Sequence, residues 1–355
     1  MPASITKLAP LIKIIPTKNL DLHPHSNSRL ESINQCPTFG VVNGQRQYAS
    51  NARAMALEAG STMHEVFAAV RIWQLEYVQK LPKHALATAE RIFTLERWQQ
   101  AKEQAKDAIA NRREHLQAVT FAILHSSEWY DDPNDTIRTM NNMELSTIHY
   151  IDERLEYMEN WPIYVEDKHD PLSRIGIEQT FDVTLVFKDK AQFRYIGTID
   201  GLVQKKATGQ WTLDENKTAS RLDEGFRLSF DMRHQVTGYC AASTVVFGFP
   251  IFNARVTGLK IKPTNRGEDI CVVEPSRDEN SIRHWAAWLR YTAEMFETYK
   301  DDFENAPRFT HSCNRYFRPC SLLPFCVDTP EGRQEQFEQM QEASQSPSEK
   351  AVQET

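Results

Sequence analysis

Residues 175–219 read IGIEQTFDVTLVFKDKAQFRYIGTIDGLVQKKATGQWTLDENKTA, and they set the architecture of this chain. Runs rich in β-branched and aromatic residues cover 175–187, 193–203 and 211–219, and the polar turns KDKAQ and QKKATGQ separate them. Strands joined by short turns predict an antiparallel meander. Because helical patterns precede and follow the meander, we expect an α/β fold with a central mixed sheet flanked by helices.

Charged side chains interrupt the second and third predicted strands. Glu215 and Lys217 are two residues apart, so they share one face of their strand, and a hairpin can bring Asp200 beside Glu215. Converging carboxylates bind a hard cation such as Mg²⁺ or Mn²⁺. Lys217 could orient or activate an attacking water, or stabilise charge on a phosphate. The residues alone leave open a solvated hairpin with an ion pair, since Glu-x-Lys often arises by chance.

The net charge of −7 does not exclude a nucleic-acid partner, because the charge is unevenly distributed. Residues 329–355 hold six Glu and two basic residues, a net of −4, which leaves −3 on the rest of the chain. No apolar run approaches the ~20 residues of a membrane span. The N-terminus lacks a secretory cleavage pattern, so we expect a cytoplasmic protein without membrane association. The chain has no phosphate-binding motor motif.

The predicted organisation is one domain with irregular ends. Residues 1–27 are expected to be irregular, 28–328 to form a single domain with a helical insert over 83–160, and 329–355 to be a disordered acidic tail. Helical patterns cover 51–78, 83–128, 137–159, 228–247 and 281–302. Two further strands are predicted over 251–261 and 268–275.

Two of these helices carry polar residues that fit a site for nucleic acid or metal. Gln235 and Tyr239 stand at i and i+4 and share a face, with Arg233 close by. An amide and a phenol on that face could contact a DNA backbone or stack on a base. His64 lies on an otherwise apolar helix face, where it is either a core residue or a nitrogen ligand that would favour Mn²⁺.

Cysteines at both ends of the chain indicate a metal or cluster site. Cys313, Cys320 and Cys326 lie close together in sequence, and Cys36 supplies a possible fourth thiolate. Four thiolates can hold a [4Fe–4S] cluster or a structural Zn²⁺. The cluster is favoured over zinc because the spacing lacks the C-x₂-C knuckles of most zinc sites. The remaining cysteines have apolar surroundings and are expected to be buried thiols: Cys240 and Cys271.

The order of motifs resembles a known nuclease family. The motifs are Cys36-Pro37, Gly60 to His64, Gly197 to Asp200, Glu215 to Lys217, Gln235 to Tyr239, and the cysteines Cys313, Cys320 and Cys326. This order is similar to the RecB-like branch of the PD-(D/E)XK nucleases. More narrowly, it resembles the iron–sulfur subgroup, which includes AddB-type nuclease domains, CRISPR-adaptation nucleases and phage exonucleases. The resemblance covers roughly residues 28–326.

The resemblance implies a restriction-endonuclease-like core and a set of site residues. The implied catalytic residues are Lys217, Asp200 and Glu215. The implied metal ligands are His64, Asp200, Glu215, the carbonyl of Asn216, and Glu178. The implied cluster ligands are Cys36, Cys313, Cys320 and Cys326. The residues implied to contact DNA or to support that contact are Gln235, Tyr239 and Arg233.

The function that the resemblance implies is a metal-dependent DNA exonuclease in recombination, repair or phage DNA metabolism. Its cofactors would be Mg²⁺ or Mn²⁺ and a [4Fe–4S] cluster, with Zn²⁺ as the less favoured occupant of the cysteine site. Its partners would be DNA and a separate helicase or recombination protein, in the host cytoplasm if the protein is phage-encoded. The alternative is a non-cleaving DNA-binding or scaffold subunit that an iron–sulfur or zinc site stabilises.

Overall fold

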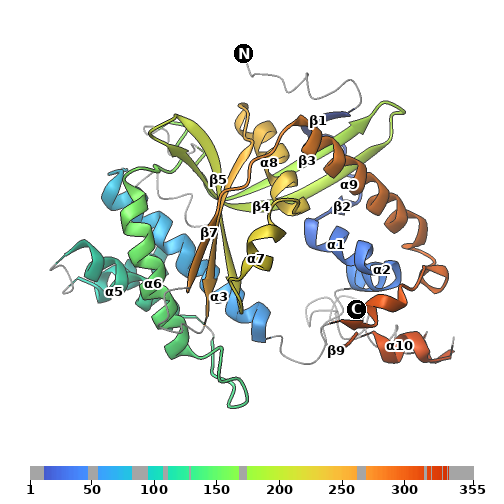
Figure 1. Ribbon diagram of the computed structural model, residues 1–355, viewed down its shortest axis with the longest axis horizontal. Coiled ribbons are helices and arrows are strands. Elements are labelled where there is room, and N and C mark those ends of the chain that lie inside the picture. The colour runs from blue at the N-terminus through green and yellow to red at the C-terminus, as the bar shows by residue number, and fades with distance from the viewer. Residues whose placement is uncertain are drawn as a thin grey trace, which may run out of the picture. The chain divides into compact units, whose positions relative to one another are not determined.

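The protein is an α/β protein with a mixed, seven-stranded central sheet flanked by helices (Figure 1). The computed structural model describes residues 12–46, 55–81, 95–106, 111–127, 129–167, 174–261, 269–315, 318–320, 322–329, 331–333 and 335. The sheet order is β1-β3-β4-β5-β6-β7, with β2 paired to β4. The strands are β1 Ile12–Pro16, β2 Pro24–His25, β3 Ile177–Phe187, β4 Gln192–Lys205, β5 Gln210–Ala219, β6 Asn253–Lys260 and β7 Ile270–Val273.

The helices lie before, between and after these strands in the sequence. They are α1 Asn27–Gln35, α2 Pro37–Arg46, α3 Met55–Trp73 with a π-helical extension Gln74–Val78, α4 Leu95–Gln104, α5 Arg112–His125, α6 Met140–Met158, α7 Glu224–Ser229, α8 His234–Phe247, α9 Glu279–Tyr299 and α10 Leu323–Val327. A small hairpin joins β8 Asn314–Arg315 to β9 Arg318–Pro319. Among the described residues, none of the helices combines the length and the apolar content that a membrane span requires.

The predicted meander is confirmed as β3, β4 and β5. The turn between β3 and β4 closes with the N–H of Phe187 donating to the carbonyl of Ala191 at 2.9 Å. The turn between β4 and β5 contains Gly209 at φ +70°, a left-handed conformation that favours glycine. Side chains alternate along each strand, so consecutive residues of β5 face opposite sides of the sheet.

A parallel pair makes the sheet mixed. Strand β6 runs parallel to β5 from Thr212–Asn253 to Ala219–Lys260. Parallel neighbours need a crossover connection, and α8 supplies it between the two strands. The helix ends at Gly248, which has φ +79° and therefore stops it in the left-handed conformation typical of a helix end. Strand β5 is central and largely buried as a result.

The chain divides into two compact units, and the residues predicted as one domain over 28–328 fall in both. Of the described residues, unit 1 comprises those within 55–182 and 197–282. Unit 2 comprises those within 12–46, 183–196 and 283–335. The long strands β3 and β4 each pass from one unit into the other.

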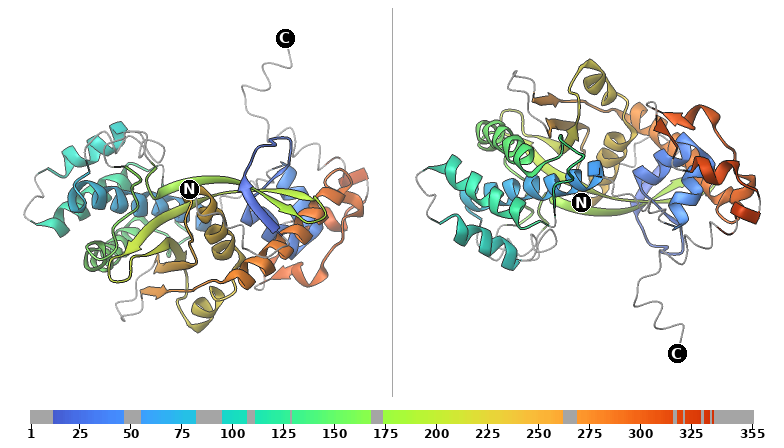
Figure 2. Two further views of the ribbon diagram at one scale, coloured as in Figure 1. Left: turned by 90° about the horizontal axis from the view of Figure 1, so that it is seen from above. Right: turned by 90° about the horizontal axis from the view of Figure 1, so that it is seen from below.

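Each unit has its own apolar core. In unit 1, helices α3 (blue), α5 (teal) and α6 (green) pack side by side (Figure 2). Their buried residues include Phe67, Trp73, Ile123 and Tyr150. In unit 2, α1 and α2 pack against each other, and Gly40 permits their close approach because a Cβ there would lie 2.4 Å from the Cα of Ile33. The buried apolar residues around them are Ile33, Val41, Val42, Phe296, Leu322 and Phe325.

The prediction that residues 1–27 are irregular is wrong for two short strands. Strand β1 pairs antiparallel with β3, with Ile14 opposite Leu185. Strand β2 pairs parallel with β4, with Pro24 opposite Arg194. Runs this short show no clear alternation in the sequence, and only their partner strands hold them extended.

The prediction of one helix over 228–247 is wrong at its start. Helix α8 begins at His234, after Arg233 in an extended conformation. The shorter helix α7 precedes it and starts where Asp223 accepts the N–H of Phe226 at 3.1 Å. Asp is a favoured N-cap residue, so this start had a sequence signal.

The prediction of a continuous helix over 83–128 is wrong in its middle. Helix α4 ends at Gln104, and α5 begins after Asn111, whose side-chain oxygen accepts the N–H of Glu114 at 2.9 Å. Asn followed by Glu three residues later is a helix-start pattern. Residues 82–94 lie outside the described part of the chain, as does most of the acidic tail predicted over 329–355.

Candidate metal centre

The site is built where β4 and β5 stop pairing through their backbones. The paired residues run from Lys205–Gln210 to Leu202–Leu213. Beyond them, the side chain of Asp200 accepts the backbone N–H of Asn216 at 2.8 Å. The carboxylate therefore takes the place of a backbone acceptor and is held at a fixed position beside β5.

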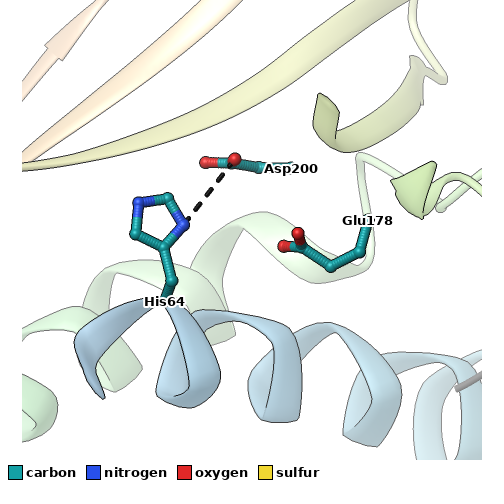
Figure 3. Close-up of side chains that lie close together, drawn as sticks. All are labelled: His64, Glu178 and Asp200. Atoms are coloured by element: carbon teal, nitrogen blue, oxygen red, sulfur yellow. Dashed lines mark ion pairs between the residues drawn. The ribbon is translucent and has the colours of Figure 1, made fainter. Parts of the chain in front are cut away.

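Three side chains from different elements converge next to this point (Figure 3). His64 from α3, Glu178 from β3 and Asp200 from β4 each offer one ligand atom, and these atoms all lie within 4.8 Å of one another. His64 Nδ1 and Asp200 Oδ1 are 3.7 Å apart, and their side chains are 36% and 8% exposed. An imidazole nitrogen with carboxylate oxygens is a donor set suited to Mn²⁺ or Mg²⁺. Their role as ligands remains a prediction.

Glu178 is held in an unfavourable conformation and environment. Its backbone φ is +44°, in the left-handed region that costs a non-glycine residue about 1–2 kcal/mol. Its Oε1 is buried and has no hydrogen-bond partner among the described residues. Burial, and then the negative charge of Asp200, raise the pKa of Glu178 to about 8. A cation bound between these carboxylates would relieve both the burial cost and the repulsion.

Glu215 and Lys217 form an ion pair beside this group, in which Glu215 is buried and the Lys217 side chain is 24% exposed. Lys217 Nζ donates to Glu215 Oε2 at 3.1 Å, while Glu215 Oε1 has no partner in the described part of the chain. Burial, and then Asp200, raise the pKa of Glu215 to about 7. Glu215 is not one of the three residues whose ligand atoms lie within 4.8 Å of one another. Its unpartnered oxygen nevertheless fits a role toward a cation.

The charge state of Lys217 restricts what it can do. Burial alone would lower its pKa, but the carboxylates of Glu215 and Asp200 outweigh burial and raise the pKa above its ordinary value. Lys217 is therefore protonated at neutral pH and can donate hydrogen bonds, but it cannot take a proton from water. Of the three roles considered from the sequence, orienting the attacking water and stabilising charge on the phosphate fit this state, whereas activating the water by taking its proton does not.

The surroundings of His64 favour its neutral form. Burial lowers its pKa and Lys217 and Arg71 lower it further, while Asp200 opposes them. A neutral imidazole keeps a lone pair for a metal.

Helix α8 presents its polar face to the same region. Gln235 Nε2 donates to the Tyr239 hydroxyl at 3.2 Å, so the predicted shared face is confirmed. The Tyr239 ring packs edge-on against Phe181, with ring centroids 5.4 Å apart. Burial, and then Glu215, raise the pKa of Tyr239 to about 12, which keeps the phenol protonated. Arg233 precedes α8, and its guanidinium lies 5.3 Å from the centre of the Phe230 ring.

Sequence reasoning missed the buried charges on the other face of β5. Asp214 accepts from Arg71 at 3.1 Å and from Arg154 at 2.7 Å, and all three side chains are fully buried. Asn216, whose carbonyl was a predicted ligand, directs its side chain to the hydroxyl of Tyr150 on this same face. The available signal was the polar run DENK, in which Asp214 and Asn216 alternate with Glu215 and Lys217.

Unit 2 brings the segments around the predicted cluster cysteines together. Cys36 lies between α1 and α2, and the hydroxyl of Ser312 donates to the carbonyl of the preceding residue, Gln35, at 2.6 Å. The N–H of Cys320 donates to the carbonyl of Cys313 at 2.8 Å. Burial raises the pKa of Cys326, the charge of Arg308 partly opposes this, and the thiols of the other three predicted ligands raise the pKa further. All four are free cysteines, but among the described residues no three of them bring their sulfur atoms within 4.8 Å of one another, so a shared ligand role remains a prediction.

The remaining cysteines are buried, as expected: Cys240 and Cys271.

The chain matches no protein-family model and no curated protein. The resemblance to RecB-like nucleases therefore remains a prediction from the ordered motifs.

The raised pKa values of Glu178 and Glu215 predict that the metal-free protein loses stability as pH rises. Both carboxyls ionise near pH 4.5 when unfolded, but only near pH 8 and pH 7 in the folded protein. The unfolded chain therefore binds fewer protons between pH 5 and 8, and stability falls across that window. Glu178→Gln should reduce this fall, measured as melting temperature in EDTA. The exposed control Glu156→Gln should leave it unchanged. Equal pH dependence in Glu178→Gln and wild type would contradict the assignment.

Anaerobically purified protein is expected to contain about four irons per chain and to be brown. Cys320→Ser should lose the iron, because one of four thiolate ligands is removed, whereas the buried Cys271→Ala should keep it. Iron analysis and visible absorbance measure both outcomes. A colourless protein with about one zinc would instead assign the site to Zn²⁺.

Proposed function

We propose that this protein is a metal-dependent DNA exonuclease of the RecB-like PD-(D/E)XK type, with a restriction-endonuclease-like core around β3, β4 and β5. The observation that carries the proposal is the convergence of His64, Glu178 and Asp200 within 4.8 Å, beside the partly buried ion pair of Glu215 and Lys217.

The residues at this site fit one or two divalent cations. His64, Glu178 and Asp200 would hold the metal, with Glu215 and the carbonyl of Asn216 as further ligands. Within the described part of the chain, one oxygen of Glu178 and one of Glu215 have no hydrogen-bond partner, which supports this fit because buried carboxylate oxygens normally have one. A bound Mg²⁺ or Mn²⁺ would supply an activated water and offset charge on the attacked phosphate.

The protein's own groups would position the substrate for in-line attack. Lys217 stays protonated beside Glu215, so we assign it to orienting the attacking water and to stabilising negative charge on the phosphate. Gln235 and Tyr239 on α8 are assigned to contact with the DNA strand near the scissile bond, with Arg233 at the start of the helix. The protonated phenol of Tyr239 can donate a hydrogen bond to a phosphate oxygen.

The cysteine site in unit 2 is proposed to hold a [4Fe–4S] cluster, with zinc as the less favoured occupant. Its ligands would join Cys36, near the start of the chain, to the segment 313–326. Such a site stabilises a fold by linking distant segments. Since the sequence has no motor motif, the proposed partners are DNA and a separate helicase or recombination protein, in recombination, repair or phage DNA metabolism.

Wild-type protein is expected to degrade end-labelled linear DNA with Mn²⁺ or Mg²⁺ and to be inactive in EDTA. Lys217→Ala should reduce the cleavage rate by about 10²–10³-fold, as expected for loss of one charge-stabilising donor. The matched control is Lys206→Ala, an exposed lysine in the turn of the same hairpin, which should cleave like wild type. Single- and double-stranded substrates labelled at either end report strand preference and polarity.

Two outcomes would overturn the proposal in different ways. Full activity in Lys217→Ala would show that the assigned hairpin is not the catalytic site. DNA binding by wild type without cleavage in any divalent metal would favour the non-cleaving DNA-binding or scaffold subunit.

A further inference from the structure

Arg71 lies on α3, the helix that carries His64, and it is in none of the motifs that carry the family resemblance. It follows His64 on α3 by about two helical turns, so both side chains are on the same side of the helix. Its side chain is fully buried. A guanidinium without access to water must find its hydrogen-bond partners inside the protein.

The first partners of Arg71 are the two residues that flank Glu215 on β5. Arg71 Nε donates to Asp214 Oδ2 at 3.1 Å, and Nη2 donates to the Asp214 carbonyl at 2.7 Å. The Asn216 amide accepts from Arg71 Nη1 at 3.2 Å when its nitrogen is oriented to donate to Tyr150. One guanidinium therefore fixes β5 immediately before and after Glu215.

Arg71 also lies against β4, at the residue next to Asp200. A Cβ on Gly201 would stand 2.8 Å from Arg71 Nε and 3.1 Å from the Asp214 carbonyl. No side chain fits there while the guanidinium is in place. Asp200 is thus a proposed ligand, and the absence of a side chain at the next residue, Gly201, leaves the space that the Arg71 guanidinium fills.

One side chain therefore joins the elements that carry His64, Asp200 and Glu215. We propose that Arg71 is a positioning residue that fixes the relative placement of these groups and thereby sets the affinity of the metal centre for a divalent cation. This inference rests on the metal centre of the proposed function. The planar guanidinium of arginine presents several N–H donors and can hydrogen-bond to two strands at once, whereas the ammonium of lysine is a single compact charge.

Arg154 offers a matched comparison within the same buried cluster. From α6 it donates to both oxygens of Asp214, at 2.9 and 2.7 Å, and its guanidinium lies over the rings of Tyr150 and Tyr157 on its own helix. Helix α6 carries none of the proposed metal ligands. Arg154 therefore shares the charge, burial and carboxylate partner of Arg71, but not its position between α3 and β4.

The experiment measures Mn²⁺ binding to the metal-free full-length chain by calorimetry, together with its melting temperature. Arg71→Lys keeps the charge and removes the fork. We expect it to weaken Mn²⁺ binding about 10–100-fold, as is typical for residues that orient metal ligands. Arg154→Lys should lower the melting temperature as well but bind Mn²⁺ like wild type. A purely structural role would lower both melting temperatures and change neither affinity.

Gly201→Ala tests the same inference with Arg71 and every charge retained. The added methyl displaces the guanidinium, so Mn²⁺ binding should weaken as in Arg71→Lys. This variant tests the positioning role of Arg71 if Arg71→Lys does not fold.

The inference would be overturned if Gly201→Ala or a folded Arg71→Lys bound Mn²⁺ with wild-type affinity. It would also be overturned if Arg71→Lys and Arg154→Lys lost Mn²⁺ affinity equally. Wild type that binds no Mn²⁺ would overturn it and the metal centre together. Wild type that binds Mn²⁺ without cutting DNA would overturn only the nuclease.

Discussion

The buried carboxylate of Asp214 is the constraint on which unit 1 depends. It lies on the central strand β5, fully buried, and ion pairs with Arg71 and Arg154 compensate its negative charge. Burial alone would raise the pKa of Asp214, but the two arginines lower it well below its ordinary value. Removing one partner from a buried ion pair costs about 3–5 kcal/mol, so α3, α6 and β5 are held together as a set.

Alternation along β5 converts this constraint into a site. Asp214 and Asn216 face helices α3 and α6, and Glu215 and Lys217 therefore face the opposite side of the sheet. The structural residues Asp214 and Asn216 thus alternate with the proposed catalytic residues Glu215 and Lys217 on opposite faces of one strand. Glu178 has an unfavourable φ and an oxygen without a hydrogen-bond partner among the described residues. Such local costs are retained at functional sites when the surrounding fold holds the residue in place.

Periodicity predicted the elements that pack on a core, and it failed where a local contact ends or starts an element. The meander over 175–219 and the helix over 281–302 were right because long alternating or amphipathic runs reflect one buried face. The breaks at Asn111 and Asp223 depend on single capping hydrogen bonds. The strand at 12–16 exists because β3 lies beside it, which no local pattern expresses.

By itself, the sequence determined the local arrangement of the chain. It determined the strand order of the meander, the shared face of Glu215 and Lys217, and the shared face of Gln235 and Tyr239. These follow from fixed periods of two residues in a strand and 3.6 in a helix. Only the tertiary structure decided that His64 and Glu178 meet Asp200, and that Arg71 fits against Gly201. Those contacts join separate elements through backbone pairing and buried charge, and their distances depend on how the whole of unit 1 packs.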